Sequence, residues 1–165
     1  MLQKEEMDQL DKGWTKIMII WIAMLSSLVV YFVVCKMIED QLTIIMAGSQ
    51  LEVLKYALFG IAALTLLGAY MFRKFMMGKI ARPVNGSAFQ SDIHPAISKY
   101  IPVCVVVMAF SESVGIYGMV LFLISKDLVS LYQLMILSAI AMVVFRPKKE
   151  ELIYIAEQMK SGDSA

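Results

Sequence analysis

Glu112 is the residue whose type and position could do chemistry in this chain. It is the only charged residue in an apolar run from Tyr100 to Ser125, and it lies near the middle of that run. Such a run can cross a bilayer whose hydrocarbon core is about 30 Å thick, which places the carboxyl group near the midplane. Burial there costs an acidic side chain roughly 2.5 to 3.5 kcal/mol, so we expect a partner or a task for it. Because the ionised form is disfavoured in a low dielectric, that task would be reversible binding of a proton or another cation.

The other residue types exclude most alternative chemistry. Cys35, Cys104 and the single histidine, His94, have no partners at metal-ligand spacing, so we expect no metal site and no disulfide framework. The chain has no recognisable nucleophile and base, phosphate-binding loop or cofactor motif. We therefore expect no cofactor and no enzymatic activity from this chain alone.

Four apolar segments must position Glu112. The chain has 165 residues, of which 59% are hydrophobic, whereas soluble domains average about 45 to 50%. The segments are residues 17–34, 56–72, 100–125 and 128–145. None alternates as a strand would, and helices are the only open elements that satisfy their own backbone hydrogen bonds in lipid. The sequence therefore predicts an all-α membrane protein with four transmembrane helices at about 17–36, 53–74, 98–125 and 128–146.

The polar segments complete the predicted organisation. We expect an N-terminal segment at 1–16, a four-helix transmembrane domain at 17–146, a loop at 73–99 within it, and a tail at 147–165. Within the tail, apolar residues recur at helical spacing, at Leu152, Ile155, Ala156 and Met159. This spacing predicts a short amphipathic helix that lies on the membrane surface or against a partner, with a solvated, frayed tail as the alternative.

Basic residues indicate the orientation of the chain. All but three of the 15 Lys and Arg residues fall in the N-terminal segment, in the central loop, or in the tail and the adjoining Arg146, the exceptions being Lys36, Lys55 and Lys126. Segments rich in Lys and Arg are retained on the cytoplasmic side, so both termini and the central loop should be cytoplasmic. The segregation indicates orientation, and we expect no nucleic-acid partner.

The sequence around Glu112 resembles a known family. It runs Met108-Ala109-Phe110-Ser111-Glu112-Ser113-Val114-Gly115-Ile116-Tyr117-Gly118. This is similar to the second, ion-carrying helix of the proteolipid subunit c of rotary F-type and V-type ATP synthases, in which small residues precede a Glu that is followed by three residues and Ile-Tyr-Gly. Upstream, Arg82-Pro83 resembles the polar loop of that helical hairpin without its Gln. The resemblance covers less than half of the chain.

The resemblance implies an ion-binding role for Glu112 and a supporting role for Ser113 and Tyr117. Ser113 and Tyr117 share one helix face, about 100° to 140° away from Glu112, so they would complete the site of a neighbouring copy. Their spacing resembles the sodium-binding version of the motif. However, the second apolar segment offers only Thr65 as a polar group away from its ends, so we expect a proton in preference to sodium.

Glycines mark the expected contacts between helices. We expect Gly115 and Gly118 of the third segment, and Gly60 and Gly68 of the second, to permit close packing. The family's first helix has a denser run of glycines, and its hairpin has no counterpart of the two outer helices predicted here.

Two functions follow as hypotheses. The first is a subunit-c-like proteolipid of the bacterial inner membrane that binds or translocates a proton at Glu112. It would lie in membrane lipid, in a homo-oligomer or a larger hetero-oligomeric complex. The second is a non-transporting structural or assembly subunit that keeps the motif for helix packing. Replacement of Glu112 by Gln would separate the two.

Overall fold

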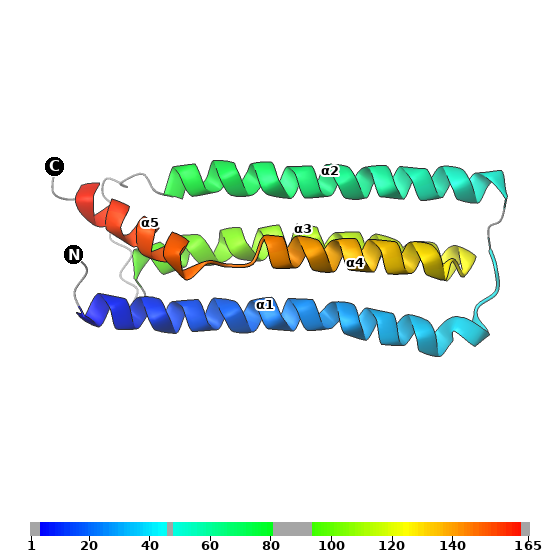
Figure 1. Ribbon diagram of the computed structural model, residues 1–165, viewed down its shortest axis with the longest axis horizontal. Helices are drawn as coiled ribbons and strands as arrows, with labels where there is room; N and C mark the ends of the chain where they lie inside the picture. The colour runs from blue at the N-terminus through cyan, green and yellow to red at the C-terminus, as the bar shows by residue number, and fades with distance from the viewer. Residues whose placement is uncertain (1–3, 46–47, 81–93, 163–165) are drawn as a thin grey trace.

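The chain is helical in the parts described by a computed structural model, which are residues 4–45, 48–80 and 94–162 (Figure 1). Its α-helices in these parts are α1 Lys4–Ile38, α2 Ser49–Ile80, α3 Pro95–Ser125, α4 Leu128–Val144 and α5 Lys149–Gly162. A short 3-10 helix, η1 Glu39–Gln41, follows α1. The all-α prediction is confirmed for these residues.

Three of the described helices are long and apolar enough to cross a membrane: α1 with its extension η1, α2 and α3. Helix α4 has 17 residues and reaches that standard only together with α5, to which it is joined through a bend of 43°. Pro147 explains the break, because it lacks the N–H that would continue the helix and disfavours a helical conformation in Arg146. The described residues thus contain three candidate spans, or four if the bent pair counts as one.

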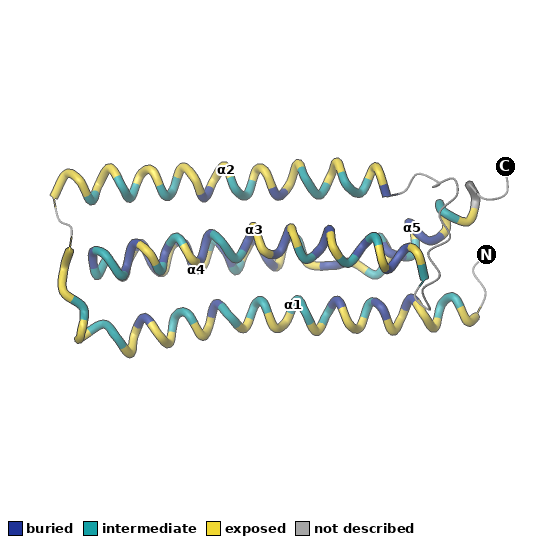
Figure 2. The backbone as a smooth tube through the Cα atoms, turned by 180° about the vertical axis from the view of Figure 1, so that it is seen from behind, coloured by how far each residue is buried: buried dark blue, intermediate teal, exposed yellow. Residues whose placement is uncertain are grey.

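Helix α3 is the central element of the bundle, in contact with each of the other four α-helices. Its buried residues extend from Ala96 near its start to Ser125 at its end. Helices α1 and α2 lie on opposite sides of the α3–α4 pair (Figure 1). Exposed positions recur along both helices (Figure 2), and large apolar residues such as Val29 and Leu64 are among the exposed ones. Such an exterior would promote aggregation in water and is favourable against acyl chains, as expected of an integral membrane protein.

The described parts of the three basic segments lie at one end of the bundle. Helix α1 begins, α2 ends, α3 begins and α5 lies at this end, whereas the α1–α2 and α3–α4 connections lie at the opposite end (Figure 1). This arrangement is the one that the distribution of Lys and Arg requires if that end is cytoplasmic. Arg82 and Pro83, to which the family resemblance assigns the polar loop, lie outside the described residues.

The helices extend beyond the predicted membrane segments. Helix α1 begins at Lys4, and the expected loop at 73–99 is helical at both ends, because α2 continues to Ile80 and α3 begins at Pro95. Basic residues near a helix C-terminus interact favourably with the helix dipole, so the Lys and Arg residues in the last turns of α2 are compatible with the continuation of that helix. His94 caps α3, its Nδ1 accepting a hydrogen bond from the backbone N–H of Ala96 at 3.2 Å.

Helix α5 packs against the chain's own bundle. Its Leu152, Ile155 and Ala156 are buried in a cluster with Leu10 and Tyr100. The tail segment for which the sequence predicts an amphipathic helix thus buries its apolar face against α1 and α3.

A polar network also holds α5. Glu151 accepts hydrogen bonds from Arg73 Nη2 on α2 at 2.8 and 3.0 Å and from the Tyr100 hydroxyl at 3.1 Å. The backbone N–H of Lys148 donates to the same hydroxyl at 3.1 Å.

Candidate functional site

Glu112 lies on α3 where that helix meets α1. Its Oε1 accepts a hydrogen bond from Ser27 Oγ at 2.5 Å and another from the Tyr31 hydroxyl at 2.8 Å. Both donors converge on one oxygen, and no hydrogen bond from a described residue reaches Oε2. The three side chains are each half-buried. The site is therefore a carboxyl group with two hydroxyl partners, at the edge of a helix interface and near the middle of two long apolar helices.

The spacing on α1 explains how two hydroxyl groups reach one oxygen. Ser27 and Tyr31 are four residues apart, which places them on the same face of the helix, one turn apart. Leu28, next to Ser27, is buried and packs against Phe122 and Met135 in the core between α1, α3 and α4. Burial of Leu28 fixes the rotation of α1 and so directs the hydroxyl pair toward Glu112.

Two glycines of α3 let the neighbouring helices approach. A Cβ at Gly115 would lie 2.7 Å from Leu28 Cδ2 on α1 and 3.4 Å from Ser138 Oγ on α4. A Cβ at Gly118 would lie 2.9 Å from Leu134 Cβ and 3.3 Å from the Leu131 carbonyl oxygen, both on α4. Both distances to carbon are shorter than ordinary carbon contacts of about 3.5 to 4.0 Å. Glycine at position 115 therefore allows α1 to approach α3 closely enough for the hydroxyl groups of α1 to reach Glu112.

The charges around the site leave the carboxyl group without a basic partner. Among the described residues, no Lys, Arg or His side chain lies within ion-pair distance of Glu112. The ion pairs of those residues involve other acids, namely Lys36–Glu39, Lys55–Asp127, Arg73–Glu151, Lys149–Asp11 and Lys160–Glu6. Nor do three His, Cys, Asp or Glu side chains gather there in a group that could hold a metal ion. The environment of Glu112 is thus hydroxyl groups and hydrocarbon.

Ser27 also lies next to a backbone acceptor. Its Oγ is 2.6 Å from the carbonyl oxygen of Met24 on the same helix, in addition to its contact with Glu112. A serine hydroxyl has one hydrogen to donate and two lone pairs that accept. The single hydrogen of Ser27 can therefore satisfy the carbonyl of Met24 or the carboxylate of Glu112, but not both at full strength.

The structure places Ser113 and Tyr117 away from Glu112 of the same chain. Ser113 Oγ donates to the carbonyl of Ala109 in its own helix at 2.9 Å, and Tyr117 packs beside Val114 on the side of α3 that contacts α2. Their assignment to the Glu112 of a neighbouring copy stays a prediction.

The second helix places its small and polar residues differently from the third. Thr65 Oγ1 donates to the carbonyl of Ile61 in its own helix at 2.8 Å. Gly60 and Gly68 lie on exposed positions of α2, where an added Cβ would have no neighbour within 4 Å. Within one chain these two glycines make no close helix contact, so their predicted packing role would require another molecule.

Sequence reasoning missed Ser27 and Tyr31. The resemblance directed attention to the helix immediately before α3, whereas the partners of Glu112 come from α1. A signal did exist, because Ser26, Ser27 and Tyr31 are the polar side chains within the apolar part of the first segment. Two hydroxyl groups one turn apart in a membrane helix could have been matched with the single carboxyl group in another.

A second acidic side chain lies at the end of the bundle opposite to α5. Asp127 caps α4 by accepting from Ser130 N at 3.1 Å and Ser130 Oγ at 2.6 Å, and it pairs with Lys55 Nζ of α2 at 2.9 Å. Burial raises the pKa of the Asp127 carboxyl, but the hydrogen bonds from Ser130 and Lys55 outweigh burial and lower the pKa to about 2. Asp127 therefore has the permanent basic neighbour that Glu112 lacks.

Comparison with known proteins identifies no relative of this chain: no protein-family model matches it, and no curated protein and no solved structure is similar to it.

Proposed function

We propose that this integral membrane protein binds and releases a proton at Glu112, as a subunit-c-like proteolipid in an oligomer or a larger membrane complex. The observation that supports this most directly is the pair of hydroxyl groups on one carboxyl oxygen, without a basic partner among the described residues. A fixed ion pair would hold a carboxylate permanently ionised, whereas hydroxyl groups can serve both of its protonation states.

The contacts of Ser27 suit a protonated carboxyl group. With a proton on Oε1, Glu112 would donate to Ser27 Oγ, Ser27 would donate to the carbonyl of Met24, and Tyr31 would donate to Oε1. Every hydrogen then has an acceptor at the distances given above. On ionisation, Ser27 would turn its hydrogen from the carbonyl to the carboxylate. Rotation of one hydroxyl group would thus accompany each gain or loss of the proton.

Substitution of Tyr31 on α1 and of Tyr117 on α3 distinguishes a carboxyl site within one chain from a site shared between copies. Loss of a hydrogen bond to a charged group costs about 1.5 to 3 kcal/mol and to a neutral group about 0.5 to 1.5 kcal/mol. Tyr31→Phe should therefore favour the protonated carboxyl by a difference of about 1 kcal/mol. Tyr117→Phe should leave the site unchanged if the partners come from α1, and should act like Tyr31→Phe if they come from a neighbour.

Modification by a hydrophobic carbodiimide measures this directly, because the reagent attacks a protonated carboxyl group in lipid. We expect labelling at Glu112 to fall as the pH rises, with a midpoint that moves upward in Tyr31→Phe. Ser26→Ala is the matched control, since Ser26 bonds only to the carbonyl of Ile22 in its own helix at 2.8 Å. Labelling that is independent of pH, or equally altered in the Ser26 variant, would contradict proton binding.

A structural role in helix packing is the alternative, and the hydrogen bonds of Ser27 and Tyr31 to Glu112 fit this role too. Both hydrogen bonds join α1 to α3, and a glutamine at position 112 could accept both of them. A packing role should therefore survive Glu112→Gln, whereas proton binding cannot. We expect Glu112→Gln to abolish proton flux in reconstituted vesicles, with assembly unchanged. Flux equal to that of the original chain would assign Glu112 to packing.

A further inference from the structure

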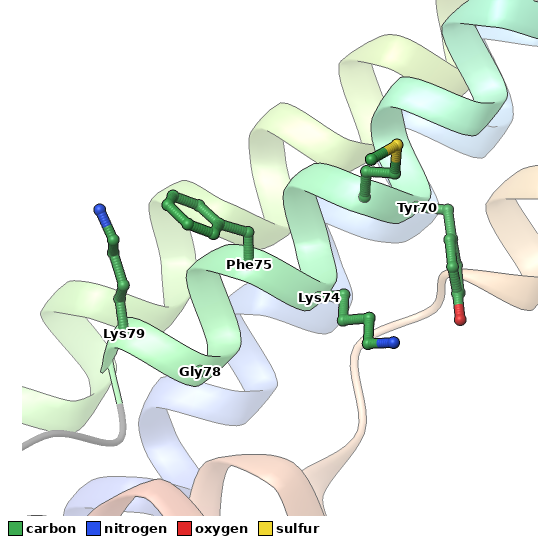
Figure 3. A pocket seen from close by; sticks show the side chains of 6 residues that line it. Tyr70, Lys74, Phe75, Gly78 and Lys79 are labelled. Atoms are coloured by element: carbon green, nitrogen blue, oxygen red, sulfur yellow. The ribbon is translucent and has the colours of Figure 1, made fainter.

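A shallow pocket lies on the outer face of α2, near the C-terminal end of that helix. It is lined by Tyr70, Met71, Lys74, Phe75, Gly78 and Lys79 (Figure 3). These residues recur at intervals of three and four along one helix, so they cover one side of it, with Lys74 and Lys79 about 140° apart around the axis. Gly78 leaves the backbone bare in this face, and an added Cβ there would have no neighbour within 4 Å. The hollow thus exists because position 78 has no side chain.

Two ammonium groups border the hollow without an acidic partner. Lys74 and Lys79 extend from the helix in different directions, with Gly78 between them in sequence (Figure 3). Neither forms an ion pair with any residue that the structure describes, and Lys79 Nζ lies 4.2 Å from the centroid of the Phe75 ring. Arg73, by contrast, turns inward to Glu151, and its side chain is 14% exposed. The pocket therefore has two positive charges that no acidic side chain of the described residues compensates, and such charges favour an anion.

The order of residues along the pocket specifies what kind of anion fits. Tyr70 and Met71 lie on the side of the apolar segment and are exposed, whereas Lys74, Gly78 and Lys79 lie farther toward the basic end. Aromatic residues and lysines occur in this order where a membrane helix passes from hydrocarbon to headgroups. A soluble anion would need the charges but not the apolar wall beneath them.

We propose that this pocket binds an anionic phospholipid. Its phosphate group would lie over Gly78 between Lys74 and Lys79, and an acyl chain would extend along Met71 and Tyr70. Clustered basic residues at the edge of a membrane helix recognise anionic headgroups in this way. The proposal does not depend on proton binding at Glu112, which lies on another helix.

Binding of labelled phosphatidylglycerol and phosphatidylcholine to the purified full-length chain in mixed micelles tests this assignment. Lys74→Ala/Lys79→Ala should bind phosphatidylglycerol about 30-fold more weakly, since each ammonium group near an anionic surface contributes roughly five-fold. Gly78→Leu keeps both charges and fills the hollow, so we expect a loss of about ten-fold. Phosphatidylcholine should bind weakly to every variant.

Lys12→Ala/Lys16→Ala is the matched control, because it removes two exposed lysines from α1 at the same end of the bundle. We expect this variant to bind phosphatidylglycerol as the original chain does. An equal loss of phosphatidylglycerol binding in the control would show a general attraction of basic residues to an anionic surface and would overturn the proposal of a specific lipid site at this pocket. Undiminished binding to Gly78→Leu, or complete displacement of the lipid by millimolar inorganic phosphate, would overturn it as well.

Discussion

Substitution of Gly118 by alanine should separate α3 from α4 and destabilise the bundle. The added Cβ would lie 2.9 Å from Leu134 Cβ and 3.3 Å from the carbonyl oxygen of Leu131. Neither atom can rotate away, because one is fixed to its backbone and the other belongs to it. Since ordinary carbon contacts are about 3.5 to 4.0 Å, the helices must move apart by roughly 0.6 to 1 Å.

The magnitude follows from two opposing contributions. Overpacking of a well-packed interface costs about 1 to 3 kcal/mol, whereas replacing glycine by alanine within a helix returns up to about 1 kcal/mol. We therefore expect Gly118→Ala to lower the free energy of unfolding by about 1 to 2 kcal/mol. Gly115→Ala should cost less, because the nearest atom is the mobile end of Leu28. Gly60→Ala, on the open face of α2, should be neutral or slightly stabilising.

Reversible unfolding in mixed micelles of a mild and a denaturing detergent measures this order. Gly60→Ala serves as the matched control, since it makes the same chemical change on a helix that offers nothing to meet the new methyl group. Equal stability of the Gly60 and Gly118 variants would refute the argument that glycine at 118 sets the distance between α3 and α4.

Three further predictions concern the polar contacts at the two ends of the bundle. The pKa of Asp127 lies below its ordinary value of 3.8. The stability that Asp127 contributes with Lys55 should therefore be present above about pH 4 and lost as the pH falls through about 2. Acid unfolding curves should show this loss in the original chain and not in Asp127→Asn. Burial lowers the pKa of His94 below its ordinary value of 6.5. The neutral imidazole should therefore cap and stabilise the start of α3 above that pH, and the cap should weaken as the pH falls. Amide exchange in the first turn of α3 would measure this pH dependence, which His94→Asn should remove. Arg73→Gln should weaken the packing of α5 against the bundle by about 1 to 3 kcal/mol and make α5 more sensitive to proteolysis. The double variant with Glu151→Gln should recover part of this loss. Equal digestion of all forms would contradict the argument that the Arg73–Glu151 contact holds α5 in place.

The sequence was sufficient for the all-α fold class, but not for the rotation of the helices. Length and hydropathy alone predict apolar helices, and the single charge in the third apolar segment marks its middle. The face that a helix buries is harder to predict in a membrane, because both the buried and the lipid-facing sides are apolar and the usual periodicity is lost. For α3, buried Val114 and exposed Ile116 are chemically alike. Small and hydroxyl-bearing residues are the remaining signal of a helix face.

The helices extend past the predicted membrane segments for a related reason. Charges indicate where hydrocarbon gives way to headgroups, whereas a helix ends where its backbone hydrogen bonds end. Helix α2 therefore continues through Arg73 and Lys79 to Ile80, well past the membrane limit that the first basic residue indicates. Pro95 is a local signal of a different kind, because Pro is favoured in the first turn of a helix, and α3 begins at this residue.

Helix α1 changes what the resemblance to a two-helix proteolipid implies for Glu112. In that family, hydroxyl groups of an adjacent copy complete the carboxyl site, whereas Ser27 and Tyr31 belong to the same chain. Two hydrogen bonds at about 0.5 to 1.5 kcal/mol each offset much of the roughly 2.5 to 3.5 kcal/mol that an acidic side chain costs at mid-membrane depth. The carboxyl group therefore needs no second copy to be tolerated in lipid. The proton binding proposed at Glu112 therefore does not require self-association. Carbodiimide labelling of Glu112 in a monomeric micelle should match that in vesicles, and labelling that appears only in oligomers would return the site to the neighbouring copy, with Ser113 and Tyr117 as its partners.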